Sequence, residues 1–172
     1  MEIWDLYNNE RAKTEETMVR GSQIPKDLYH LVVHVCIFNK KGEMLIQHRQ
    51  PFKDGWPGMW DITVGGSSVS GDSSVTAAER EVLEELGYEL NLQNMRPSLT
   101  VNADSIFDDF YLVEREVDTS RLKLQYEEVK EVKWAALEEI LSMIDASTFI
   151  PYYKSFIQTL FDMRFHPGMR KI

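Results

Sequence analysis

Cysteine is almost absent from this chain, since Cys36 is the single one among 172 residues. An internal disulfide is therefore excluded, and one free thiol fits a reducing compartment. Long hydrophobic runs are missing as well, so we expect no membrane span. The first ten residues, MEIWDLYNNE, lack the basic segment and apolar stretch of a secretion signal. These absences predict a cytoplasmic protein that does not act at a membrane.

A basic run or stripe is also missing, and the net charge is −9. Proteins that grip a nucleic-acid backbone do so with clustered lysine and arginine, so we expect no nucleic-acid polymer as partner. A phosphate-bearing small molecule would be repelled by such a chain. A bound metal ion would remove that repulsion by bridging protein and phosphate.

The composition, 43% hydrophobic and 27% charged, is that of a globular protein. A length of 172 residues fits one domain over 1–172. A strand or arm is predicted at 1–7 and a loop at 11–26, and strands are predicted at 31–38, 43–49, 60–64, within 90–101, at 106–116 and at 129–134. Helices are predicted from residue 73 or 74 to 86, at 137–144 and at 148–164. This order favours an α+β sandwich.

The most informative segment is the acidic cluster around Glu81, Glu84 and Glu85. On a helix these glutamates are spaced i, i+3 and i+4, so their carboxylates share one face. Like charges at this spacing repel each other and weaken the helix. A hard divalent cation, Mg²⁺ or Mn²⁺, would turn that repulsion into binding, because such cations require oxygen ligands.

The same segment resembles the signature of the Nudix hydrolase family. That signature is Gly, five residues, Glu, seven residues, Arg-Glu, a bulky apolar residue, any residue, Glu-Glu, any residue, Gly and a bulky apolar residue. The matching positions here are Gly66, Arg80-Glu81, Val82, Glu84-Glu85, Gly87 and Tyr88, while Asp72 stands where the family has Glu. The resemblance implies one Nudix domain with an N-terminal arm at 1–27 and a core at 28–165. It also implies an α/β/α sandwich with a mixed β-sheet and flanking helices.

For the chemistry, the resemblance implies metal-assisted hydrolysis of a diphosphate linked to another moiety. Glu84 and Glu85 are then the principal metal ligands, helped by the backbone carbonyl of Gly66. Glu81 is either a ligand or the general base. Arg80 reaches Glu84 at i+4 and orients a carboxylate. Asp72 is either a water-mediated ligand or a charge favoured by the helix dipole.

Outside this segment the candidates are less specific. An acidic loop residue often adds to such a site, and Glu128 is the first choice, with Glu127 as its alternative and as a candidate substrate contact. Arg49 and Lys53 flank a Pro/Gly loop and are candidate phosphate contacts. Phe52, Trp56 and Phe107 either stack on a base or pack in the ordinary way. His34 and His48 have no second ligand at zinc spacing, so packed or surface histidines are expected.

The leading hypothesis is a metal-dependent hydrolase that acts on a nucleoside diphosphate derivative or a similar small diphosphate. Two other functions remain open. The stretches LVVHVCIFNKKGEMLIQHRQ, GMWDITVGG and FIPYYKSFIQTLF look like the subgroup related to isopentenyl diphosphate isomerases. An isomerase of this kind carries a cysteine near the position of Val64-Gly65, where this chain has none. The other alternative is a non-catalytic module that binds nucleotides. The resemblance leaves a homodimer open, since dimers are common in the family.

Overall fold

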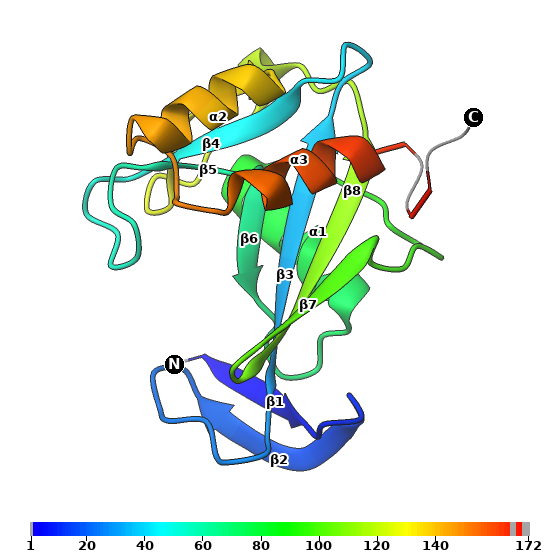
Figure 1. Cartoon of the computed structure of the whole chain (residues 1–172). Coiled ribbons are helices and arrows are strands. Elements are labelled where there is room, and N and C mark those ends of the chain that lie inside the picture. The colour runs from blue at the N-terminus through cyan, green and yellow to red at the C-terminus, as the bar shows by residue number, and fades with distance from the viewer. Residues whose placement is uncertain (1, 166–167, 170–172) are drawn as a thin grey trace.

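The N-terminal residues form a separate β-hairpin. The computed structural model describes residues 2–165 and 168–169, and in it β1 (Ile3–Tyr7) pairs antiparallel with β2 (Lys13–Val19). The strand predicted at 1–7 is confirmed over Ile3–Tyr7, whereas the loop predicted at 11–26 is wrong over Lys13–Val19, which forms β2. Its polar residues lie on a small two-stranded sheet with one exposed side, where polar side chains are compatible with a strand. Figure 1 shows this hairpin beneath the main sheet.

The main sheet contains seven strands within the described part of the chain. They are β3 (His30–Phe38), β4 (Met44–Arg49), β5 (Trp60–Asp61), β6 (Val64–Ser67), β7 (Leu99–Ala103), β8 (Ile106–Glu114) and β9 (Val129–Ala135). The order is β5-β4-β3-β8-β7, with β6 also paired to β3 and β9 to β4. The β3–β8 pair is parallel and the other pairs are antiparallel, so the sheet is mixed, as predicted.

Helices cover both faces of this sheet (Figure 1). On one face α1 (Ser74–Leu86) packs against Val33, Val35 and Ile37 of β3. On the other face α2 (Leu137–Asp145) and α3 (Lys154–Met163) pack against Cys36 and Phe38. A short 3₁₀ helix spans Thr119–Arg121. Burial on both faces explains why β3 is an almost unbroken apolar run, and the predicted α+β sandwich is confirmed.

The segment predicted as one strand at 60–64 is instead divided between two partners. β5 pairs with β4, whereas β6 pairs with β3. Between them Thr63 accepts a hydrogen bond from the Ile37 amide at 2.9 Å and donates its hydroxyl to the Leu45 carbonyl. A side chain thus replaces the backbone ladder where the chain crosses from β4 to β3, and the two parts of the sheet diverge there.

Two other predicted elements are shorter than expected. The strand within 90–101 is confined to β7, which begins after Pro97, a residue without an amide donor. The helix predicted at 148–164 begins only at Lys154. Before it, Phe149 forms a bridge with Trp60, and the Ile150 amide donates to the Trp60 carbonyl at 2.9 Å. The segment 149–152 therefore lies beside β5. None of the helices in the described ranges is long and apolar enough to cross a membrane.

Candidate active site

α1 has well-defined ends that fix the orientation of its acidic face. Ser73 is the N-cap, and its hydroxyl accepts a hydrogen bond from the Thr76 amide at 3.2 Å. At the other end Gly87 adopts a left-handed conformation with φ of 61°, which glycine tolerates best. The predicted helix bounds and both predicted caps are confirmed.

The three glutamates of the acidic face of α1 differ strongly in burial. Glu85 is only 5% exposed, and Glu81 is largely buried, whereas the Glu84 side chain is 51% exposed. The acidic face is therefore buried at Glu81 and Glu85, because the helix turns them toward the diverging strands. Gln47 of β4 donates a hydrogen bond to Glu85 at 3.0 Å. Burial, followed by repulsion from Glu81, raises the pKa of Glu85 to about 8.

Gly66 lies directly against this acidic face. A Cβ atom at this position would lie 2.1 Å from the carboxyl carbon of Glu81, so a larger residue would displace that carboxylate. The close approach explains why glycine is needed here, and it brings the β6 backbone beside the buried carboxylates.

Arg80 is the centre of a hydrogen-bond network around these carboxylates. It donates to Glu81 at 2.9 Å and to Glu84 at 3.1 Å, so the predicted i+4 contact is confirmed. It also donates to the Ser67 carbonyl at 3.0 Å, and to Asp72 at 2.9 and 3.1 Å. Burial opposes the charge of Arg80, but the hydrogen bonds to Asp72 and Glu81 raise its pKa above the usual value. Asp72 therefore anchors Arg80 in this structure.

A single cleft of about 860 Å³ collects most of the predicted site residues. Those that line it are Gly66, Arg80, Glu81, Glu84, Glu85, Arg49, Lys53 and Glu128. Asp72 and Glu127 are not among its lining residues. Lys53 forms an ion pair with Glu128, and Arg49 holds the Gly55 carbonyl at 2.8 and 3.0 Å. The basic side chains that were expected to contact phosphate thus share a cleft with the acidic face of α1.

The donor set suits a hard divalent cation, because it consists of carboxylate oxygens and a backbone carbonyl. Within residues 2–165 and 168–169, no three acidic, histidine or cysteine side chains already converge in a metal-binding arrangement. In this arrangement Arg80 contacts oxygens of Glu81 and Glu84, and Gln47 contacts one of Glu85. The residue types fit the cation once these side chains exchange partners.

No sequence motif pointed to the opposite wall of the cleft. His34 of β3 lies 2.6 Å from Asp108 of β8, measured from Nδ1 to Oδ1. Nearby, the Tyr152 hydroxyl donates to Asp61 at 3.0 Å. All four residues line the cleft. They come from distant parts of the chain and match no short motif, so only the β3–β8 pairing and the position of segment 149–152 bring them together.

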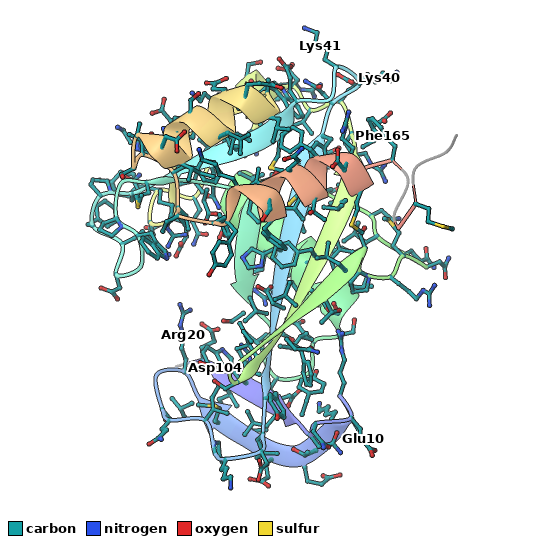
Figure 2. All side chains as sticks on the ribbon, viewed as in Figure 1. Glu10, Arg20, Lys40, Lys41, Asp104 and Phe165 are labelled. Atoms are coloured by element: carbon teal, nitrogen blue, oxygen red, sulfur yellow. The ribbon has the colours of Figure 1, made fainter. Side chains whose placement is uncertain are left out.

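The N-terminal hairpin also contributes to the cleft. Glu2 and Arg20 line it and form an ion pair at 2.8 Å. In Figure 2 the labelled Arg20 lies between the hairpin and the main sheet. Asp5 fixes the hairpin to the loop before α1 by accepting from Ser70 and from the Gly71 amide, each at 2.8 Å.

Among the aromatic candidates, Trp56 lines the cleft and is half exposed, whereas Phe52 and Phe107 do not line it. Cys36 is 0% exposed and packs in the cluster under α3. Burial raises the pKa of its thiol, so the sole cysteine is an inert core residue. His48 is packed on Trp60, as expected for a structural histidine.

Comparison with known proteins agrees with this geometry. The sequence model of the NUDIX domain matches residues 28–158. An uncharacterized Nudix hydrolase of Listeria innocua is 43% identical over 164 residues, which cover 95% of this chain and 96% of that protein. An isopentenyl-diphosphate Delta-isomerase of Shigella flexneri is 34% identical over 150 residues, covering 83% of this chain and 81% of the isomerase.

Solved structures show the same fold. A crystal structure of DR0079 from Deinococcus radiodurans superimposes with a TM-score of 0.73 at 22% identity, covering 91% of this chain and 98% of that one. The structure of a MutT protein from Methanosarcina mazei gives a TM-score of 0.63 at 27% identity, covering 80% of this chain and 96% of the other.

Proposed function

The chain belongs to the Nudix family as a hydrolase of phosphoanhydride bonds, and we propose that its substrate is a nucleoside diphosphate derivative or a similar small diphosphate. One observation carries this proposal. The acidic face of α1 and the backbone of Gly66 share one cleft with Arg49 and Lys53. Oxygen ligands for a cation and basic groups for phosphate are thus available to one bound molecule.

The family uses divalent cations such as Mg²⁺ or Mn²⁺, and we assign the binding groups in this chain. Glu81, Glu84, Glu85 and the Gly66 carbonyl would hold the cation, with Glu128 as an additional ligand. A cation bound there would neutralise phosphate charge and lower the pKa of a water molecule. Glu81 would be either a ligand or the general base.

The other groups have positioning roles in this proposal. Arg80 contacts both Glu81 and Glu84, so it sets the orientation of these carboxylates, and Asp72 in turn holds Arg80. Lys53 is paired with Glu128. A phosphate entering the cleft competes with Glu128 for Lys53, which would release the Glu128 carboxylate toward a cation.

Isomerisation of isopentenyl diphosphate is the second candidate, because several relatives near 34% identity carry that name. Moving a double bond requires a group that donates a proton and one that removes it. The cysteine expected for such chemistry is absent from Val64 and Gly65, and Cys36 lies in the core away from the cleft. Hydrolysis is therefore favoured.

A substrate panel tests the proposal directly. ADP, CDP, GDP, UDP, ADP-ribose and isopentenyl diphosphate are incubated with the protein in Mg²⁺ or Mn²⁺, and phosphate products and isomers are quantified. We expect hydrolysis of at least one nucleotide, loss of that activity in EDTA, and its return with added Mg²⁺. Undiminished hydrolysis in EDTA, or isomerisation without hydrolysis, contradicts the proposal.

A further inference from the structure

His34 is held rigidly at the wall of the cleft opposite α1. Its Nδ1 lies 2.6 Å from Asp108, and its ring stacks on Phe110 with a centroid distance of 4.7 Å and an interplanar angle of 11°. The side chain is 16% exposed and lines the cleft. Since Asp108 holds Nδ1 and Phe110 stacks on the ring, the remaining polar atom, Nε2, has a defined position.

Nε2 of His34 has no hydrogen-bond partner in the described part of the chain, whereas Nδ1 does. It lies close to the backbone of β6, because a Cβ atom on Gly65 would be 2.6 Å from it. Glycine at position 65 thus leaves room for the imidazole. A polar atom that is fixed, nearly buried and unpartnered beside a cleft is suited to a ligand.

The two glycines of β6 relate His34 to the acidic face of α1. Gly66 makes room for Glu81 on one face of the sheet, and Gly65 makes room for His34 on the other. In the β3–β6 ladder these glycines lie opposite Val33 and His34. The cleft includes both glycines, so it extends across β6 from the carboxylates to the imidazole. A ligand with phosphates at α1 can therefore extend over the glycines toward His34.

A second histidine, His48, shows how a histidine with only a packing role differs from His34. It also contacts a carboxylate, Glu131 at 2.8 Å, and stacks on an aromatic ring, Trp60, at 4.7 Å and 11°. Its Nε2, however, lies 3.0 Å from the Gly58 carbonyl, and it does not line the cleft. The structural histidine has both nitrogens partnered, whereas His34 has one nitrogen left for a ligand.

We propose that His34 Nε2 binds a ribose hydroxyl of a nucleoside diphosphate, with Asp108 as the residue that orients the imidazole. This proposal rests on the proposed function and names the moiety that the cleft recognises. With Nδ1–H donating to Asp108, Nε2 accepts a hydrogen bond when the ring is neutral and donates one when it is charged. A hydroxyl can serve both states, because it is donor and acceptor at once.

The surroundings favour a polar moiety over a prenyl chain. Asp61, Asp108 and Tyr152 line the same part of the cleft as His34 and present polar atoms to it. An isopentenyl group would cover these atoms without offering any hydrogen bond, which is costly. A ribose has hydroxyls that can satisfy them.

Kinetics with a ribose and a dideoxyribose substrate test the proposal. The ribose substrate is whichever of ADP, CDP, GDP and UDP is hydrolysed best. The second substrate is the 2′,3′-dideoxy analogue of the same nucleotide. For wild type we expect KM to rise about tenfold on removal of the hydroxyls, the effect of one well-formed hydrogen bond, with kcat within twofold. In His34→Phe, which retains ring stacking, both substrates should share the higher KM.

Two variants separate hydrogen bonding from packing. His34→Gln places an amide near the position of Nε2, and we expect it to restore KM to within about threefold of wild type. His48→Phe removes an equally stacked imidazole outside the cleft, and KM should not change. Equal KM values for the two substrates in wild type, or a fall in kcat instead of a rise in KM in His34→Phe, overturn the proposal.

A binding measurement keeps the test independent of hydrolysis. AMP, CMP, GMP and UMP contain no phosphoanhydride bond, so calorimetric titration with Mg²⁺ reports binding alone. For wild type, the 2′,3′-dideoxy form of the nucleotide that binds tightest should bind about tenfold more weakly than the ribose form. For His34→Phe, the two forms should bind with the same affinity. If no diphosphate is hydrolysed, the proposed function fails while this titration still decides the role of His34. Absence of binding, or binding that ignores the hydroxyls, overturns the inference.

Discussion

The two walls of the cleft, on either side of β6, are built in opposite ways. The acidic wall comes from one helix and the turn before it, and it places Glu81 and Glu85 together in a buried position. The imidazole wall comes from β3, β8, β5 and the segment before α3, and it pairs His34 with Asp108. The acidic wall has three carboxylates around one arginine, whereas on the imidazole wall Asp108 pairs with His34 and Asp61 lies 3.6 Å from Arg49.

In the proposed function, this difference identifies the acidic wall as the one that a bound ion would stabilise. Burial raises the pKa values of Glu81 and Glu85, and repulsion from Glu84 adds to the effect on Glu81 while repulsion from Glu81 adds to the effect on Glu85. Both carboxylates therefore resist ionisation, and a bound cation would favour their charged form. On the imidazole wall burial opposes the charge of His34, but its hydrogen bond with Asp108 prevails and raises its pKa. In our proposal a cation balances the charge of the acidic wall, whereas the charge of His34 is balanced within the chain by Asp108.

The largest effect is expected for Glu85→Gln. We expect kcat to fall about 10³-fold, because the substitution removes a predicted metal ligand. Without metal the variant should be more stable than wild type at pH 7.5 by about 1–2 kcal/mol, since a buried carboxylate with a raised pKa destabilises the fold above its usual pKa.

Steady-state kinetics and urea unfolding measure both effects of this substitution. Exposed Glu89, which does not line the cleft, gives the matched control Glu89→Gln. Activity close to wild type in Glu85→Gln would mean that the acidic wall is not the metal site.

A smaller effect is expected for Arg80→Lys. Lysine keeps the charge but cannot form the planar fork that reaches Asp72, Glu81 and Glu84 together. We expect activity to fall about 10–100-fold, as for other residues that orient metal ligands. The Mg²⁺ concentration for half-maximal activity should rise as well. If that concentration stays the same, Arg80 does not orient the ligands.

His30 lies on the same strand as His34 but has no carboxylate partner among the described residues, so we expect its pKa to shift in the opposite direction. It stacks on Trp4, and neither of its ring nitrogens has a hydrogen-bond partner in the described ranges. Burial lowers its pKa to about 4. The folded state therefore resists protonation, so its stability is complete above the usual histidine pKa near 6.5 and is lost as pH falls toward 4.

In His30→Phe this acid-dependent loss should disappear. Between pH 7.5 and 5 we expect wild type to lose about 2 kcal/mol more unfolding free energy than the variant. Urea unfolding at the two pH values measures the difference. The same pH dependence in both proteins would show that His30 titrates normally in the folded state.

The smallest effect is expected for Cys36→Ser, two residues along β3 from His34. Catalysis should stay within twofold of wild type, because the thiol lies in the core and not in the cleft. Burial of the hydroxyl should cost on the order of 1 kcal/mol of stability. Both proteins are assayed for hydrolysis and for isomerisation of isopentenyl diphosphate. Isomerisation by wild type but not by the serine variant would contradict the prediction.

The contrast between the walls also explains what could be predicted from the sequence. The acidic wall is local, so helix periodicity and caps place its glutamates on α1 and its end at Gly87. The burial of Glu85 could not be predicted, because it depends on β4 crossing beneath the helix and offering Gln47.

The imidazole wall is non-local. His34 and Asp108 become neighbours only through the parallel β3–β8 register, and Tyr152 meets Asp61 only because segment 149–152 lies beside β5. The β2 strand was missed for a related reason, since its polar sequence acquires strand geometry by pairing with β1. The periodicity of a sequence predicts which side chains share a face of one helix or strand. It does not predict which helices and strands become neighbours.

The most direct test of the division between the two walls is a comparison of Gly66→Ala with Gly65→Ala. The added Cβ displaces Glu81 in the first variant and His34 in the second. With both variants shown to be folded by circular dichroism, kcat and KM are measured for the same nucleoside diphosphate in Mg²⁺. The account predicts that Gly66→Ala lowers kcat at least 100-fold, as a displaced ligand should, whereas Gly65→Ala raises KM with kcat within about threefold. Equal losses of kcat in both variants, or a lower kcat in Gly65→Ala alone, would contradict it.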